Sequence, residues 1–209
     1  MSLFRSKPTE ESPRMFRSDF LDGFSRTPYY MVAVFFVPIT LGLLAMGIHR
    51  GGVGPLGAVG LFLAGLFVWT LTEYWLHRTL FHWIPKASWG DGFHFLLHGV
   101  HHKWPKDRLR LVLPPTVSVP LFSLFAFGFS LLLGPYTWYF ISGFSLGYMT
   151  YDLMHYYIHH GHPRSRILRR IQGHHMSHHF NKRYMELRFG VSSPIWDYFF
   201  RTREPRAPL

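Results

Sequence analysis

The chain contains no cysteine and few acidic residues. Its 209 residues include 11 Asp and Glu against 22 Lys and Arg. The absence of cysteine excludes disulfides, iron–sulfur clusters and haem–thiolate ligation, which leaves histidine as the ligand for soft or borderline metals. The scarcity of carboxylates argues against the Glu-rich dinuclear site that soluble diiron enzymes build.

Long uncharged runs are the second feature of the composition. Apolar residues make up 48% of the sequence, yet the formal net charge is +11. A basic chain suggests nucleic acid, but here the basic residues lie between the apolar runs, which is typical of an integral membrane protein. We therefore expect an all-α integral membrane protein with no nucleic-acid partner. About four transmembrane helices in two hairpins are expected, with spans at about 29–48, 55–76, 111–133 and 135–158.

The basic residues also predict the orientation in the membrane. They concentrate before the first span, between the second and third, and after the fourth. By the positive-inside rule these segments, and with them both termini, lie on the cytosolic side. The expected membrane is the endoplasmic reticulum in a eukaryote and the inner membrane in a bacterium. Residues 1–28 are expected to be a cytosolic basic segment, with an interfacial helix carrying Phe16, Phe20 and Phe24 or a disordered tail as alternatives. Residues 29–209 are expected to form a single domain.

Fifteen histidines are present, and most fall into clusters. Residues three or four apart share one face of a helix, so each cluster directs two or three imidazoles the same way. One such cluster alone is commonly an interfacial or helix-end feature, but four on one side of a membrane favour a metal site. Ten clustered imidazoles suit two ions, so we expect a dimetal site in a cytosolic helical cap formed by residues 77–110 and 155–203. The clusters are His77 and His82; His98, His101 and His102; His155 and His159; and His175, His178 and His179.

The motifs HRTLFH, HGVHHKWP, YDLMHYYIHHG and HHMSHH, followed by FGVSSPIWDYFF, resemble those of the membrane fatty acid hydroxylase superfamily. The resemblance covers about residues 13–203 and is strongest to the fatty acid 2-hydroxylases of sphingolipid acyl chains, through HFLLHGVHHKWPKDRLRLVLPP. It implies that the ten clustered histidines are the metal ligands. Fungal and animal members carry an N-terminal cytochrome b5 domain, whose motif this sequence lacks. We therefore expect the short form, with a separate electron donor such as cytochrome b5, or a ferredoxin with its reductase.

Other residues near the clusters are candidates for supporting roles. Glu73 and Asp152 share a helical face with His77 and His155, where they could accept the other imidazole N–H, or simply cap the helix at the membrane interface. His94, four residues before His98, is expected to support the site or to line the substrate entrance, and His160 and His174, which adjoin ligands, are expected to form hydrogen bonds around it. The aromatic residues expected to line an acyl channel, or else to belong to an interfacial belt, are Tyr74, Phe81, Phe95 and Tyr156. The tail is expected to pack Phe189, Trp196 and Phe199 against the cap.

The chemistry follows from clusters that adjoin apolar helices. A lipid tail offers nothing to hydrolyse, so we expect two iron ions and O2 as cofactors rather than zinc-bound water, although zinc can replace iron in purified protein. The expected reaction is O2-dependent hydroxylation of an acyl chain at C2, on a fatty acid or on the N-acyl chain of a sphingolipid. A lipid desaturase or a sterol or carotenoid oxidase on the same metal core is the alternative. A membrane metal transporter or haem-binding protein is the more remote one, because the first two spans offer almost no polar path.

Overall fold

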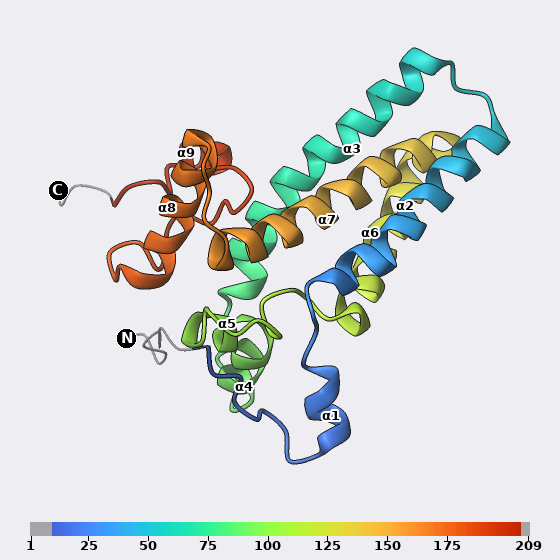
Figure 1. Cartoon of the computed structure of the whole chain (residues 1–209). Helices are drawn as coiled ribbons and strands as arrows, with labels where there is room; N and C mark the ends of the chain where they lie inside the picture. The colour runs from blue at the N-terminus through green and yellow to red at the C-terminus, as the bar shows by residue number, and fades with distance from the viewer. Residues whose placement is uncertain (1–9, 206–209) are drawn as a thin grey trace.

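The computed structural model describes residues 10–205, and the regular elements in that range are all helical. Four long helices form one body and several short ones gather at one of its ends (Figure 1). The long helices are α2 (Tyr30–Arg50), α3 (Pro55–Trp75), α6 (Pro115–Leu133) and α7 (Thr137–His160). The shorter elements are α1 (Asp19–Phe24), η1 (Leu76–Phe81), α4 (Gly90–His94), η2 (Phe95–Gly99), α5 (Val100–Lys103), η3 (Gly134–Tyr136), α8 (Arg166–Phe180) and α9 (Ile195–Phe199).

Three helical stretches of the described chain are long and apolar enough to cross a membrane, namely Tyr30–Arg50, Pro55–Phe81 and Pro115–His160. The third has 46 residues. As one straight helix it would measure about 69 Å, more than twice the hydrocarbon thickness of about 30 Å. It is divided by η3, where Gly134 has a φ of 53° and the chain reverses between α6 and α7. The expected spans therefore correspond to α2, α3, α6 and α7.

Two helices begin later than the sequence suggested. The third span was expected from residue 111, but α6 begins at Pro115, because Pro114 occupies the N-cap in an extended conformation and cannot continue a helix backwards. The interfacial helix near the N-terminus covers only Asp19–Phe24, because the Ser18 hydroxyl accepts the Leu21 N–H as its N-cap. Phe20 and Phe24 lie on its exposed side with their ring centroids 4.6 Å apart.

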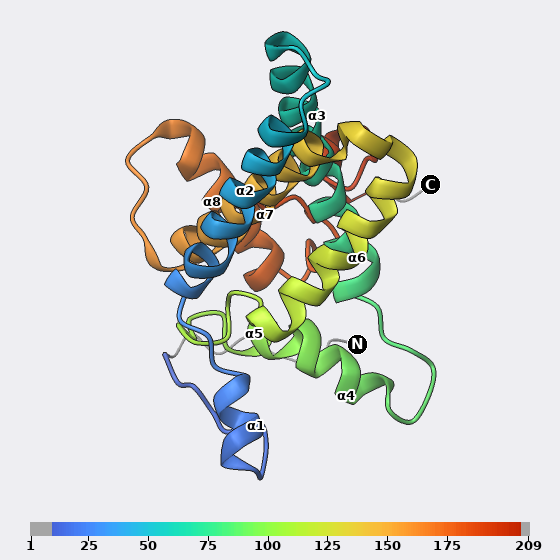
Figure 2. The ribbon, with the colours of Figure 1, turned by 90° about the vertical axis from the view of Figure 1, so that its right-hand side faces the viewer.

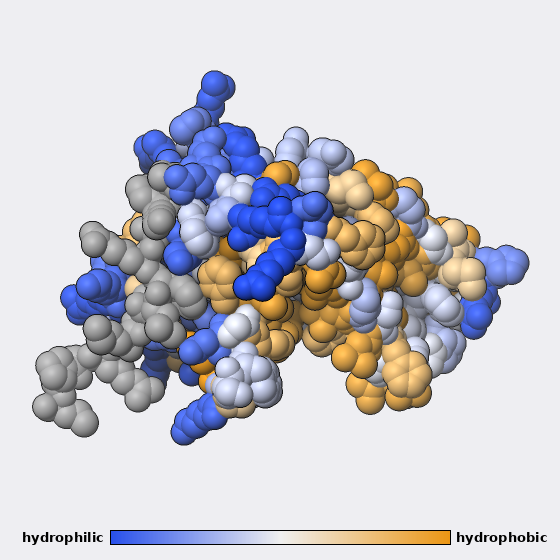
Figure 3. All heavy atoms as spheres, turned by 90° about the horizontal axis from the view of Figure 1, so that it is seen from below, coloured by the Kyte–Doolittle hydropathy of each residue, from blue (hydrophilic) through white to orange (hydrophobic). Residues whose placement is uncertain are grey.

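Helix α7 is the centre of the long bundle. It runs beside α3 and α2 (Figures 1 and 2), and its Phe144 side chain is fully buried. The Thr40 hydroxyl of α2 lies 2.8 Å from that of Ser145 on α7, which satisfies both groups away from water. The outer faces carry exposed apolar side chains such as Leu56 and Leu132, and Figure 3 shows this apolar surface over the long helices. An exposed apolar surface of this kind is expected where lipid chains surround the helices.

The short elements other than η3 gather at one end of the bundle and form a cap (Figure 2). An N-terminal strap, residues 12–27, crosses this cap. Its Asp22 carboxylate binds Arg26 at 2.9 Å and Arg110 at 3.1 Å, and the Thr27 N–H donates to the Leu109 carbonyl at 2.6 Å. Arg110 is buried and also meets Asp107. The strap is thereby tied to the segment that leads into α6.

Candidate metal centre

The first histidine pair is brought together by a π-helical turn. At the end of α3 the hydrogen-bond pattern widens, and the His82 N–H donates to the His77 carbonyl at 3.3 Å. In this pattern residues five apart share a face, so the two imidazole centroids lie 5.0 Å apart. His77 and His82 are five residues apart and would not share a face of an α-helix, but the π-helical turn brings them to the same side.

The other three clusters lie on helices that converge from different directions. His98 belongs to the π-helical turn η2, and His101 and His102 to α5. His155 and His159 occupy the last turns of α7, and α8 carries the final cluster. Every predicted ligand therefore reaches the same region. The ten imidazoles divide there into two groups of five, which are His77, His82, His98, His102 and His178 in the first group and His101, His155, His159, His175 and His179 in the second.

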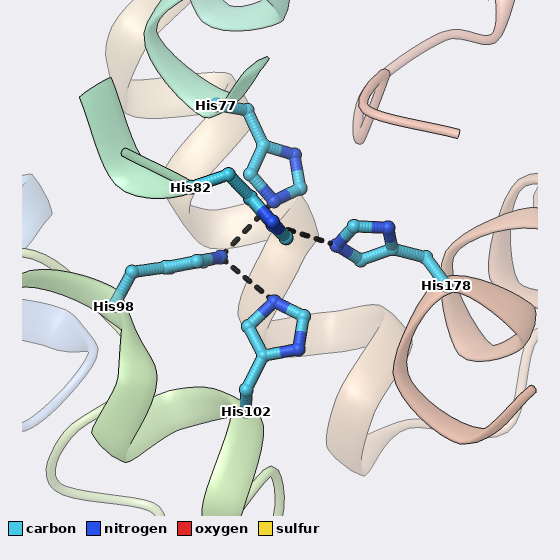
Figure 4. Close-up of side chains that lie close together, drawn as sticks. All are labelled: His77, His82, His98, His102 and His178. Carbon is cyan, nitrogen blue, oxygen red and sulfur yellow. Dashed lines mark hydrogen bonds between the residues drawn. The ribbon is translucent and has the colours of Figure 1, made fainter. Parts of the chain in front are cut away.

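Figure 4 shows the first group, whose side chains point at one another from η1 and the residue that follows it, η2, α5 and α8. The Nε2 atom of His98 lies 3.0 Å from that of His77 and 3.1 Å from that of His102. His82 and His178 approach to 3.1 Å through the same atoms. All five candidate ligand atoms lie within 4.8 Å of one another.

The second group is arranged around His175. Its Nε2 atom lies 2.9 Å from those of His155 and His159 and 3.0 Å from that of His179. His101 approaches His179 at 3.0 Å. The neighbours His101 and His102 thus serve different groups, as do His178 and His179, because consecutive residues of a helix point about 100° apart.

These short contacts fit metal ions better than hydrogen bonds. His77 and His178 donate their Nδ1–H groups to carbonyl oxygens at 2.6 Å, so the Nε2 atoms of these neutral rings carry lone pairs. The Nε2 atom of His175 faces three others and could share at most one proton with them. Nitrogens about 2.1 Å from a common ion and at right angles would lie about 3.0 Å apart. The observed spacings agree with that geometry.

Burial keeps the imidazoles in the form that binds metals. Desolvation lowers the pKa of His178 to about 4, and neutral imidazole is the ligating species. The same cause, together with the neighbouring rings, lowers the pKa values of His82, His98, His101, His102, His175 and His179 well below the ordinary value. At neutral pH the site is therefore ready to accept cations.

The two predicted carboxylates contact other groups than the imidazoles. Glu73 is buried, but it accepts the Ser192 N–H at 2.9 Å and the Ser192 hydroxyl at 2.6 Å, while His77 donates to the Phe189 carbonyl. The predicted direct contact between Glu73 and His77 is therefore wrong. Asp152 accepts the Tyr148 hydroxyl at 2.8 Å and the Leu113 N–H at 3.2 Å. Each carboxylate joins a span to a neighbouring loop.

The three additional histidines lie around the groups without joining them. His94 is buried with its ring centroid 6.4 Å from that of His82. His160 packs against Tyr156, with the ring centroids 4.6 Å apart and the rings tilted by 38°. His174 is buried and meets the Asp197 carboxylate at 2.9 Å.

The C-terminal segment supplies contacts that the sequence did not reveal. The carbonyl oxygens of Leu187 and Phe189 accept the Nδ1–H groups of His178 and His77. Backbone acceptors leave no trace in side-chain motifs, although an acidic residue in an otherwise aromatic tail, Asp197, was a usable signal. The Phe189 ring packs beside His77, as expected, whereas Phe199 is 68% exposed and does not pack on the cap.

A cavity of about 310 Å³ lies beside both histidine groups. His98 of the first group and His101 and His155 of the second line it. This volume is at the lower end of the range of about 300–1,000 Å³ for small-molecule sites. Its remaining wall is mainly apolar and includes Trp69, Leu97, Leu111, Phe122, Phe125, Phe144, Tyr148 and Tyr151.

Of the four predicted channel aromatics, Phe81 lines this cavity. The other three do not line it. Tyr74 is fully buried against Phe200. Tyr156 stacks on Tyr29 at 4.4 Å, and Phe95 packs against Trp104. Nearness to a histidine in sequence did not establish which face of each helix points to the cavity.

Comparison with known proteins gives consistent matches. A family model described as fatty acid hydroxylase matches residues 62–202. The chain is 39% identical over 198 residues to a dihydroceramide fatty acyl 2-hydroxylase of Arabidopsis thaliana, covering 92% of this chain and 80% of that protein. It is 40% identical over 198 residues to a ceramide very long chain fatty acid hydroxylase of Saccharomyces cerevisiae, covering 91% of this chain and 50% of that protein. The solved structure of full-length Scs7p, in which only the hydroxylase domain is visible, matches with a TM-score of 0.82 and 37% identity, covering 91% of this chain and 72% of that one.

Proposed function

Because this chain belongs to the fatty acid hydroxylase family, we propose that it hydroxylates C2 of a lipid acyl chain, on a fatty acid or on the N-acyl chain of a sphingolipid. The overall reaction replaces one C–H bond by C–OH and consumes O2, two electrons and two protons, releasing one water. The choice of C2 and of a sphingolipid rests on the names of the relatives, which include a dihydroceramide fatty acyl 2-hydroxylase.

The observation that carries the proposal is the cavity that reaches both groups of five histidines. Its apolar wall, with Phe122 and Phe144 among the lining residues, suits an alkyl chain and excludes water from the reacting end. His98 and His155 place both histidine groups against the cavity, where the target carbon would lie. The ten histidines are the proposed ligands of two iron ions, which would supply the electrons for reduction of O2.

The electrons are proposed to come from a separate donor, either cytochrome b5 or a ferredoxin with its reductase. The cap, with both ends of the chain, is proposed to face the cytosol, because the basic residues concentrate there. That membrane is then the endoplasmic reticulum of a eukaryote or the inner membrane of a bacterium.

The test is a lipid profile of cells that express the chain with a competent electron donor. Fragmentation mass spectrometry should find one added oxygen at the carbon beside the carboxyl or amide carbon. The product should be absent with His178→Ala, which removes a proposed ligand, and present with His49→Ala, an exposed histidine at the end of α2. Oxygen at another carbon, or a new double bond, would reject the C2 assignment. Unchanged lipids from a protein that holds two iron ions would reject the hydroxylase proposal for the lipids present.

A further inference from the structure

Asp197 is a fully buried carboxylate on α9 that contacts no member of either histidine group directly. It accepts four hydrogen bonds. Its Oδ1 atom receives the Phe189 N–H at 2.8 Å and the Thr202 hydroxyl at 2.7 Å. Its Oδ2 atom receives the Gly190 N–H at 2.8 Å and meets the His174 Nε2 atom at 2.9 Å. One side chain therefore joins residues 189–190, residue 202 and helix α8.

The segment held by Asp197 is also the one that accepts hydrogen bonds from two imidazoles. The Leu187 carbonyl lies 2.6 Å from Nδ1 of His178, and the Phe189 carbonyl lies 2.6 Å from Nδ1 of His77. Between them Arg188 has a φ of 60°, a left-handed conformation that is strained for a non-glycine residue and persists only where its surroundings hold it. The bonds from Asp197 to the next two N–H groups provide that constraint.

Gly190 shows how closely the carboxylate approaches this backbone. A Cβ atom there would lie 2.2 Å from the Ser193 carbonyl oxygen and 2.9 Å from Asp197 Oδ2. The glycine thus permits the carboxylate to reach two consecutive N–H groups. A carboxylate that accepts at both oxygens cannot be replaced by an amide without turning an N–H₂ group toward donors.

The hydrogen bonds accepted by the Leu187 and Phe189 carbonyls involve only one of the two histidine groups. Both His77 and His178 belong to the first group. In the second, His101 and His175 have buried Nδ1 atoms with no hydrogen-bond partner in the described part of the chain. Partners on the far ring nitrogen orient a ligand and raise its basicity. The Leu187 and Phe189 carbonyls therefore orient imidazoles of the first group only.

We infer that Asp197 is a positioning residue for the first histidine group, because it holds the Leu187 and Phe189 carbonyls against the imidazoles of His178 and His77. This inference rests on the proposed metal-binding role of those histidines. Its consequence is that the two metal sites are inequivalent. Loss of the Asp197 carboxylate weakens metal binding by the first group and leaves the second group loaded.

The experiment measures zinc bound to the purified full chain by mass spectrometry, during titration with a chelator. The wild type should hold two ions per chain, whereas Asp197→Asn should lose one of them at a chelator concentration about 10- to 100-fold lower. Asp22→Asn is the matched control. Asp22 is a buried aspartate that also accepts four hydrogen bonds, from Met15, Phe16, Arg26 and Arg110, but lies in the N-terminal strap. It should release zinc as the wild type does.

Two further variants identify which ion is lost. If Asp197→Asn empties the first group, adding His82→Ala should leave the remaining ion in place, whereas adding His159→Ala should remove it. If Asp197→Asn fails to fold, Thr202→Val removes a single donor to the carboxylate and should weaken the same ion more mildly, with Thr202→Ser restoring it. A wild type with fewer than two ions would reject the proposed metal site itself. Two ions in the wild type with equal loss from both groups, or no loss, in Asp197→Asn would overturn this inference alone.

Discussion

Gly65 of α3 and Gly143 of α7 form one close helix crossing, in which each glycine lies against the backbone of the other helix. A Cβ atom on Gly65 would lie 1.9 Å from the Phe140 carbonyl oxygen, and one on Gly143 would lie 1.9 Å from that of Phe62. Small residues allow such backbone approach in membrane helices. The crossing is what places His77, beyond the end of α3, beside the end of α7 that carries His155.

We predict that Gly143→Ala destabilises the protein, because backbone atoms cannot yield to the added methyl group. The expected loss is about 1–3 kcal/mol in the free energy of unfolding, measured by denaturant titration in detergent. Gly128→Ala on α6 is the control, since a Cβ there meets nothing within 4 Å. Equal stability of the two variants would show that the helices are farther apart than described.

The cavity should limit the length of the acyl chain. Phe125 lines it and packs on Phe144, which precedes His155 by eleven residues, or about 16 Å along α7. Phe125→Trp should therefore shift the preference toward shorter chains, by about fourfold in kcat/KM for each methylene that no longer fits. Phe127→Trp, at a 62% exposed position of α6, should leave the preference unchanged. Competition between acyl chains of different length measures the ratio.

Removal of metal should loosen the cap. Each histidine group combines ligands from the 98–102 segment and α8 with ligands from the end of a span, His77 and His82 or His155 and His159. An ion present at a thousandfold its Kd stabilises the folded state by about 4 kcal/mol. Chelation should therefore lower the thermal transition and speed hydrogen exchange in α8, with α2 as the internal reference. Unchanged exchange in α8 would mean that packing alone holds it.

Attachment of the N-terminal strap should depend on pH through Asp22. Hydrogen bonds from the Met15 N–H and the Arg26 side chain lower the pKa of this carboxyl below its ordinary value. Since the folded pKa is lowered, the stabilisation is complete above the ordinary value of about 3.9 and is lost as the pH falls through the lowered pKa. Protection of the Met15 and Phe16 amides against hydrogen exchange should fall over that range in the wild type. In Asp22→Asn it should be weak already at neutral pH.

Much of the architecture was predictable because it depends on local periodicity. Uncharged runs located the spans to within a few residues, except where Pro114 and Pro115 delay the start of α6. The histidine spacings indicated shared helical faces, and the structure brings together all ten of the residues so identified. The family also followed from local motifs, which the family match over residues 62–202 confirms.

The supporting residues were harder to predict, because their partners are distant in sequence. Glu73 lies four residues before His77 yet binds Ser192, 119 residues further along the chain. Tyr74 follows Glu73 and points to Phe200 rather than to the cavity. Spacing relates side chains within one helix, whereas the rotation of that helix about its axis is set by what packs against it.

The sequence by itself determined that this is a helical membrane protein of the hydroxylase family with histidines grouped on helical faces, since apolar run length and residue spacing are local properties. Only the tertiary structure decided how ten imidazoles divide into two groups, which aromatic faces line the cavity, and that Asp197 and two backbone carbonyls orient His77 and His178. These features depend on helix crossings and loop contacts between residues far apart in the chain, where close approach of backbones and the satisfaction of buried polar groups select one arrangement.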